Sequence, residues 1–132
     1  MPMIVRKSLP TIVEARREIL HAVSWQVRSN VWSPPTDVYE TEGSFIVRVE
    51  IAGMRDEDLE VAVENNVLLI SGNRPDLNER RAFYQMEIRF GRFEIATEIP
   101  VPVDVDNAVS EYKDGFLIIN LPKRNPKQIE VE

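Results

Sequence analysis

Few side chains in this chain have the types and spacing that catalysis or metal binding requires. His21 is the only histidine and cysteine is absent, so a serine or cysteine triad finds no further base. Asp56-Glu57-Asp58 offers adjacent carboxylates for acid–base catalysis, but it equally suits a charged loop. Residues 104–107 lack the glycine and the distal glutamate of a calcium-binding loop, which favours a turn, and the glycines form no phosphate-cradling run. The sequence therefore predicts a protein that is not an enzyme and uses no cofactor or metal.

The chemistry that the sequence favours is binding through an extended tail, residues 124–132. Ile129 and Val131 are separated by one residue, so both fall on the same face of an extended segment. Such a segment can add to the edge of a β-sheet and place alternate side chains in pockets. The alternative is a frayed end without a partner. Because a polar, proline-containing linker precedes the motif, we favour docking, which implies assembly into oligomers.

The size and composition of the chain indicate one globular domain with flanking segments. It has 132 residues, of which 43% are hydrophobic and 29% charged, as in ordinary globular proteins. No apolar run approaches the roughly 20 residues of a membrane span. Pro10, Glu14, Arg16 and Arg17 interrupt the first segment, so no signal-peptide core is present. We therefore expect a cytoplasmic protein that does not depend on a membrane.

Charge is distributed unevenly along the chain. Residues 1–33 hold five basic and two acidic groups, a net charge of +3, whereas residues 34–132 hold eleven basic and twenty acidic groups, a net charge of −9. An acidic body repels phosphates, which argues against a nucleic-acid partner. The basic first segment suits either contact between subunits or a solvated helix face.

The elements that must position the tail change in character at the proline pair Pro34-Pro35. From residue 11 to 29 there is no proline or glycine, and apolar residues recur near helical spacing, which predicts an amphipathic helix. Proline disfavours helical geometry in the residue before it, so the helix ends before this pair. We therefore expect a partly helical N-terminal arm, residues 1–33, followed by the main domain, residues 34–123.

In the main domain apolar and polar residues alternate, as in strands with one face turned to a core. Asn65-Asn66 is expected to form a tight hairpin turn, because asparagine tolerates positive φ, and Asp114-Gly115 a second turn. Many short strands at close spacing predict an all-β fold, an antiparallel immunoglobulin-like β-sandwich. The predicted strands cover residues 45–51, 59–64, 67–70, 93–99, 109–113 and 116–121.

One connection is too long for a plain loop in a compact domain. About twenty residues separate Gly72 from Arg92, and loops of this length are usually functional or contain structure of their own. Residues 81–90 are apolar enough to form a strand or to cover a surface. A strand on such a long arm can pair with the sheet edge of another subunit.

Several motifs, in this order and spacing, resemble a known family. Residues 37–40 open the domain, residues 50–53 precede the acidic turn, and residues 69–72 end a strand as they do in the alpha-crystallin domain of small heat-shock proteins. The tail Ile129-x-Val131 resembles the tail motif of the same family. The resemblance covers residues 33–132. The family's alanine, glycine-x-leucine and leucine-proline signature is matched by Ala108, Gly115, Leu117, Leu121 and Pro122.

This resemblance implies an ATP-independent holdase, a dimer-based oligomer that captures unfolding proteins before they aggregate. It also implies sites. The long arm would carry a strand exchanged with the dimer partner, at Arg81, Phe83, Tyr84 and Met86. The tail motif would dock between two strands of a neighbouring subunit, in a receiving groove formed by Leu59, Val61, Val105 and Val109.

One position departs from the family pattern. A strand of the family usually carries an arginine that braces the dimer, and the alignment through Phe93 and Pro100 places Ile95 there. The usual salt bridge across the dimer is then missing, unless Arg89 or Arg92 replaces it.

The partners implied are non-native client proteins and further copies of the chain. Exposed apolar surface gives affinity for unfolded chains, and assembly hides that surface until it is needed. We expect the N-terminal arm to be the main client surface, with packing inside the oligomer as the alternative role. Its contributing residues are Ile12, Ile19, Leu20, Val23 and Trp25. The runner-up interpretation is a cochaperone-like sandwich module with one dedicated partner, which needs neither the tail motif nor the exchanged arm.

Overall fold

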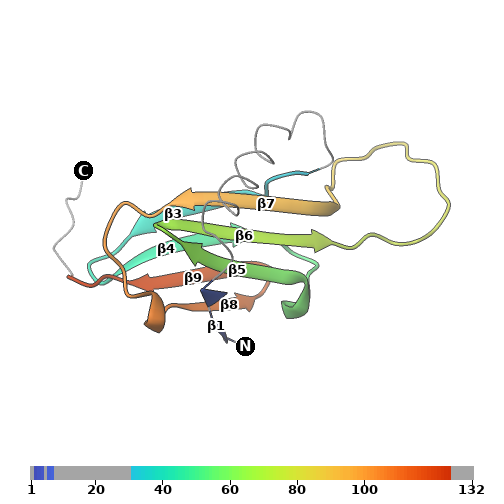
Figure 1. The fold of residues 1–132 in the computed structure, drawn as a ribbon. Coiled ribbons are helices and arrows are strands. Elements are labelled where there is room, and N and C mark those ends of the chain that lie inside the picture. The colour runs from blue at the N-terminus through green and yellow to red at the C-terminus, as the bar shows by residue number, and fades with distance from the viewer. Residues whose placement is uncertain (1, 5, 8–30, 126–132) are drawn as a thin grey trace.

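The computed structural model describes residues 2–4, 6–7 and 31–125, which form two β-sheets packed face to face (Figure 1). The expected helix over residues 11–29, with the proposed client residues, lies outside the described residues, as does the tail motif Ile129-x-Val131. Two short 3-10 turns lie in the connections between strands: η1 (Asp56–Asp58) precedes β5, and η2 (Val105–Asn107) precedes β8. The strands are β1 (Pro2–Ile4), β2 (Arg6–Lys7), β3 (Thr36–Glu40), β4 (Ser44–Glu50), β5 (Leu59–Glu64), β6 (Val67–Arg74), β7 (Gly91–Glu98), β8 (Val109–Lys113) and β9 (Phe116–Pro122).

The strand order confirms the predicted β-sandwich. One sheet runs β1-β8-β9-β4-β3 and the other β2-β5-β6-β7. Neighbouring strands are antiparallel except β2, which lies parallel to β5. Within the described part of the chain, β3 and β7 therefore end the two sheets on one side, and the short strands β1 and β2 end them on the other.

The core lies between the sheets and follows the period-two pattern of the sequence. In β4, Phe45, Val47 and Val49 are buried whereas Arg48 and Glu50 are exposed. The inward residues of β4 lie opposite inward residues of β9 in the ladder, so that Val47 pairs with Ile119. Cross-strand apolar pairs of this kind stabilise a sheet, and each fully buried side chain of this size contributes about 1.5–3 kcal/mol.

Both predicted hairpin turns are confirmed by their backbone angles. Asn65 and Asn66 have φ of 45° and 65°, and they join β5 to β6. Asp114 and Gly115 have φ of 53° and 83°, and they join β8 to β9. Positive φ at two successive central residues matches the right-handed twist of the flanking strands, so these turns fix the register of both hairpins.

Two strands differ from the sequence-based expectation. Residues 37–40 belong to β3, an edge strand that pairs with β4 alone. Most of its side chains are exposed, so its sequence lacks the alternation of apolar and polar residues that marks the other strands. A cross-strand ion pair helps to hold it, because Arg48 donates to Asp37 at 2.9 Å from the directly opposite position. The strand predicted over 67–70 continues to Arg74, since Gly72 lets the backbone of β6 pack closely against its neighbours.

The connection between β6 and β7 contains no strand within this monomer. Residues 75–90 leave the end of the sandwich as a long loop that projects away from both sheets (Figure 1). We call this loop the arm. Its ends are adjacent, because Arg74 and Gly91 face each other as the last pair of the β6–β7 ladder. The sandwich therefore closes without the arm.

Candidate interaction surfaces

The four residues predicted to receive the tail lie on β5, η2 and β8. Leu59 and Val61 point into the core and are each 7% exposed, and Val105 packs partly against the same core. Only Val109, at 44%, keeps a large exposed fraction. The structure thus places these residues on two strands and one 3-10 turn, but only the Val109 side chain on β8 is largely accessible, so the receiving pocket stays a prediction.

The outer edges of β5 and β8 lie close together. β1 pairs with β8, with Ile4 opposite Val109, and β2 pairs with β5, with Arg6 opposite Ala62. β1 ends at Ile4 and β2 begins at Arg6. Two residues of extended chain span at most about 7 Å, so the strands that lie on the two edges are close to each other. One short peptide can therefore reach both sheets at this side of the sandwich.

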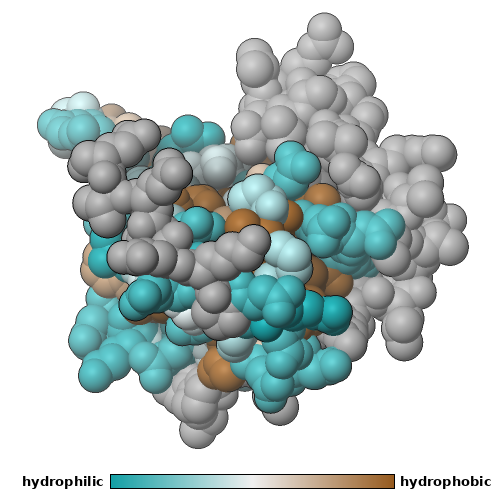
Figure 2. Space-filling model, turned by 90° about the vertical axis from the view of Figure 1, so that its left-hand side faces the viewer, coloured by the Kyte–Doolittle hydropathy of each residue, from teal (hydrophilic) through white to brown (hydrophobic). Residues whose placement is uncertain are grey.

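The arm carries most of the large apolar side chains that the described surface exposes. Tyr84 is fully exposed, and Phe83 and Met86, two further residues predicted for strand exchange, are more than half exposed; Leu77 and Ile88 accompany them. At the opposite end of the sandwich the described surface is mostly hydrophilic, with small separate apolar patches (Figure 2). The apolar surface of the described domain is therefore concentrated in the arm.

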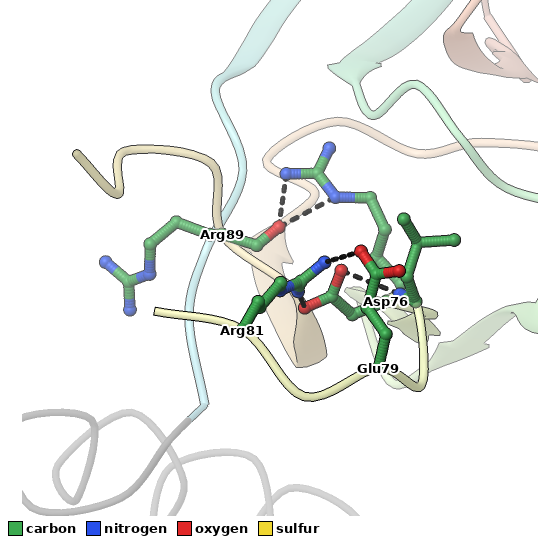
Figure 3. A network of polar contacts seen from close by, with 6 residues as sticks. Asp76, Glu79, Arg81 and Arg89 are labelled. Atoms are coloured by element: carbon green, nitrogen blue, oxygen red, sulfur yellow. Dashed lines mark hydrogen bonds and ion pairs between the residues drawn. The ribbon is translucent and has the colours of Figure 1, made fainter. Parts of the chain in front are cut away.

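Ion pairs organise the first half of the arm. Arg81 donates to Asp76 and lies 3.5 Å from Glu79, so one guanidinium joins two carboxylates (Figure 3). The same guanidinium stacks 4.8 Å from the centre of the Phe83 ring. The hydrogen bond from Arg81 holds the pKa of the Asp76 carboxyl below its ordinary value. Arg81, predicted to lie in the exchanged strand, thus shapes the arm within its own subunit.

A second arginine fixes the base of the arm. Arg74 donates through Nε to the carbonyl of Arg89 at 2.8 Å, through Nη2 to the same carbonyl, and through Nη1 to the carbonyl of Ala52 at 3.3 Å. The accepting carbonyl of Arg89 lies where the arm returns to the sheet (Figure 3). The Arg74 guanidinium also lies 4.7 Å from the ring centre of Trp32 and 5.5 Å from that of Phe90. Both ends of the arm are therefore held while its middle projects.

Trp32 completes this cluster from the segment that precedes β3. It is 6% exposed, meets Phe93 edge-on with ring centres 5.7 Å apart, and donates its indole N–H to the carbonyl of Gly91 at 3.2 Å. Sequence analysis missed both Trp32 and Arg74. No periodic pattern marks them, because their contacts join segments that are far apart in the chain.

The position assigned to the dimer-bracing arginine faces the core. Ile95 is 6% exposed and lies opposite Ile70 in the β6–β7 ladder. Of the two suggested replacements, Arg92 is exposed and pairs with Glu94 at 3.1 Å, and Arg89 lies 5.9 Å from the Trp32 ring centre. A salt bridge to a second subunit therefore cannot start from Ile95, whereas both suggested arginines are exposed.

The residues first considered for chemistry form ordinary turns. Asp56-Glu57-Asp58 is η1, where Arg55 pairs with Glu57 at 3.2 Å, and Asp104 and Asn107 bond across the turn that contains η2. In the part of the chain that the structure describes, no cluster of three potential metal ligands occurs. Nor does any described helix have the length and apolarity needed to cross a membrane. His21 lies outside the described residues.

Comparison with known proteins decides the family. The model described as "Hsp20/alpha crystallin family" matches residues 37–132. The chain belongs to this family. Spore protein SP21 of Stigmatella aurantiaca is 35% identical over 103 residues, which cover 74% of this chain and 61% of that protein. Small heat shock protein C4 of Rickettsia felis is 28% identical over 98 residues, covering 73% of this chain and 60% of that protein. The chain thus spans about three-fifths of the length of these curated relatives.

Solved structures agree with this membership of the Hsp20/alpha-crystallin family. Heat shock protein 16.0 from Schizosaccharomyces pombe is 30% identical, with a TM-score of 0.69, over 76% of this chain and 96% of that chain. A small heat-shock protein from Xylella fastidiosa, described as revealing a distinct high order structure, is 28% identical, with a TM-score of 0.64, over 76% of this chain and 97% of that chain. The resemblance read from the sequence motifs is therefore confirmed.

Four of the five residues of the matched family signature have a physical reason in this structure. Ala108 is buried at the end of η2, and Leu117 and Leu121 are fully buried in β9. Gly115 has a φ of 83°, and a Cβ there would lie 3.2 Å from that of Ala52. In this member of the alpha-crystallin family the signature therefore builds the β8–β9 hairpin and the turn that leads into it.

Proposed function

We propose that the chain is an ATP-independent molecular chaperone, a holdase that binds unfolding proteins and prevents their aggregation as an oligomer built from dimers. Its membership of the Hsp20/alpha-crystallin family supports this function. The observation that carries the proposal is the arm, which concentrates exposed apolar side chains on a loop that the sandwich does not need for closure.

The dimer would form by exchange of the arm. β3 is an edge strand without a further partner among the described residues, and Val38 and Tyr39 on it are more than two-fifths exposed. An apolar arm and an open edge on one chain suit reciprocal pairing between two copies, because each copy supplies what the other lacks. Burial of Phe83 and Met86 in the partner would contribute about 1.5–3 kcal/mol for each side chain.

Assembly beyond the dimer would use the tail motif, with Ile129 and Val131 docking on a neighbouring subunit. Each contact is modest alone, but many contacts in one oligomer act at high effective concentration and still open on heating. Opening would expose the N-terminal arm, with Ile12, Leu20 and Trp25, to unfolded clients. A protein held by this surface is removed from the pool that aggregates.

The first experiment measures light scattering from a heat-labile client protein at rising ratios of this protein, without nucleotide. We expect suppression near equal subunit ratios. Undiminished aggregation at excess would overturn the holdase and favour the cochaperone-like module with one dedicated partner.

Dimer exchange has its own test, independent of clients. Phe83→Asp with Met86→Asp should convert dimers to monomers in sedimentation analysis of the full chain carrying a disabled tail motif. Asn78→Ala with Arg80→Ala, at exposed polar positions of the same arm, is the matched control, because it removes no apolar surface. Dimers that persist in the aspartate variant would contradict exchange through the arm.

A further inference from the structure

Residues 2–7 connect the two sheets at the side of the sandwich where the tail is expected to dock. β1 adds to β8 through Pro2, Met3 and Ile4, and β2 adds to β5 through Arg6 and Lys7. We propose that residues 2–7 are a built-in ligand of this paired edge, which occupies it and excludes the tail of a neighbouring subunit. The competition with the tail rests on the proposed function, whereas the occupation of the edge does not.

The two ligands exclude each other because each receiving strand has a single open edge. The other edge of β5 is fully paired with β6 from Leu59 to Glu64, and that of β8 with β9 from Val109 to Lys113. A strand edge forms one ladder at a time. Ile4 lies opposite Val109, which is also a residue of the predicted receiving groove. A tail that adds to the same edges must therefore displace residues 2–7.

Charge favours the N-terminal segment over the tail. The segment carries Arg6 and Lys7 and no acidic residue, whereas residues 124–132 have no net charge, because Glu130 and Glu132 balance Arg124 and Lys127. The two receiving strands together are acidic, because β5 carries Glu60 and Glu64 while Glu111 and Lys113 in β8 balance each other. Opposite charges at register positions this close attract, and like charges repel.

Glu64 gives this preference a specific source. It is 2% exposed, and neither of its carboxylate oxygens has a hydrogen-bond partner among the described residues. A buried carboxylate without compensation is unfavourable, and a nearby cation offsets part of that cost. Arg6 occupies the register position opposite Ala62, which precedes Glu64 by two residues and lies on the same face of β5. The N-terminal segment therefore places a basic residue beside the strand face on which Glu64 is buried.

The consequence is a balance between two occupants that salt shifts. If the N-terminal segment holds the edge for nine-tenths of the time, the apparent dissociation constant of a tail rises about tenfold. Salt screens exposed charges, so it weakens the hold of a basic segment on an acidic edge more than the binding of a tail without net charge. Higher ionic strength should therefore promote tail docking and larger assemblies.

Binding of a fluorescent peptide with the sequence of residues 124–132 tests the competition. The receiving protein is the full chain with Ile129→Gly and Val131→Gly, so that its own tail does not interfere. Met3→Pro with Ile4→Pro removes two backbone donors from β1 and disfavours the added strand. Met3→Val with Ile4→Val, which keeps strand propensity, is the matched control. We expect the proline variant to bind the peptide about tenfold more tightly than the control; equal affinities would overturn the competition.

Hydrogen exchange supplies the second readout, which needs no tail docking. Backbone amides over residues 109–111 and 61–63 should exchange faster in the proline variant than in the control. If the peptide binds neither protein, tail docking in the proposed function has failed, and faster exchange in the proline variant still supports an occupied edge. Equal exchange in the two proteins overturns the occupation itself. Neither peptide binding nor hydrogen exchange depends on client aggregation. A failure of the holdase function is therefore distinguishable from a failure of the competition or of the edge occupation.

Discussion

The guanidinium of Arg74 lies 4.7 Å from the centre of the Trp32 ring, and this contact joins the last residue of β6 to the segment that enters the sandwich. The same guanidinium reaches the carbonyl of Arg89 at the far end of the arm. One side chain at the start of the arm therefore contacts both the end of the arm and the segment that enters the sandwich.

Arg74→Ala should loosen the base of the arm. The loss of a cation–π contact and of hydrogen bonds from a charged donor should lower the free energy of unfolding by about 1–2 kcal/mol. Thermal unfolding measures the stability, and hydrogen exchange over residues 75–90 measures the arm. Arg80→Ala, an exposed arginine in the arm itself, should change neither. Unaltered exchange in the Arg74 variant would show that the arm is not held at this point.

Gly72→Ala should destabilise the sandwich, because a Cβ at this position would lie 2.6 Å from the carbonyl oxygen of Asp58 and 2.7 Å from Cζ of Phe93. Phe93 is fully buried, so β6, η1 or the ring must shift. We expect a loss of about 1–3 kcal/mol in chemical denaturation. Gly43→Ala is the control, since nothing lies within 4 Å of its Cβ position. Equal stability of the two variants would contradict this packing.

The carboxyl of Asp76 should titrate below its ordinary range, because Arg81 donates a hydrogen bond to its charged form. A lowered folded-state pKa means that the stabilisation is present above the unfolded-state pKa and is lost as the pH falls through the folded-state value. Side-chain NMR titration measures the pKa directly. Arg81→Gln should move it back toward the ordinary value, and a titration unchanged by that substitution would exclude the ion pair in solution.

Ile129→Gly with Val131→Gly should reduce large assemblies to dimers, because the tail loses both side chains that are proposed to dock on the neighbour. Light scattering coupled to size-exclusion chromatography measures the mass. Lys127→Gly with Gln128→Gly, which loosens the same tail but keeps its apolar residues, should leave the assembly intact. Assemblies of unchanged mass in the first variant would count against tail-mediated oligomers.

The sandwich was predictable because apolar and polar residues alternate in its central strands and so show which side chains are buried. Val47 and Val49 alternate with exposed residues, and Asn65-Asn66 and Asp114-Gly115 have the turn chemistry that a hairpin requires. β3 was not predicted as a strand, since it is paired on one side only and its side chains are mostly exposed. Its presence depends on the edge of β4, which a local pattern does not reveal.

The interaction surfaces were predictable only in part. The length and apolarity of the arm were visible, and Phe83, Tyr84 and Met86 are exposed there, as strand exchange needs. The contacts that hold the arm were not visible, because Trp32 and Arg74 meet across more than forty residues of chain. Nor does any local pattern show that residues 2–7 add to β5 and β8, since strand addition at an edge is directed by the edge.

Arg74 and Gly91 face each other at the end of the β6–β7 ladder, so the arm is an insertion in a β-hairpin that is complete without it. A tight turn in place of residues 75–90 would leave every ladder of the sandwich intact. If the arm is exchanged between subunits as proposed, changes in its sequence should alter which partner a chain pairs with, at little cost to the stability of its own domain. Related chains that share this sandwich could sort into separate assemblies, or mix, through this one loop.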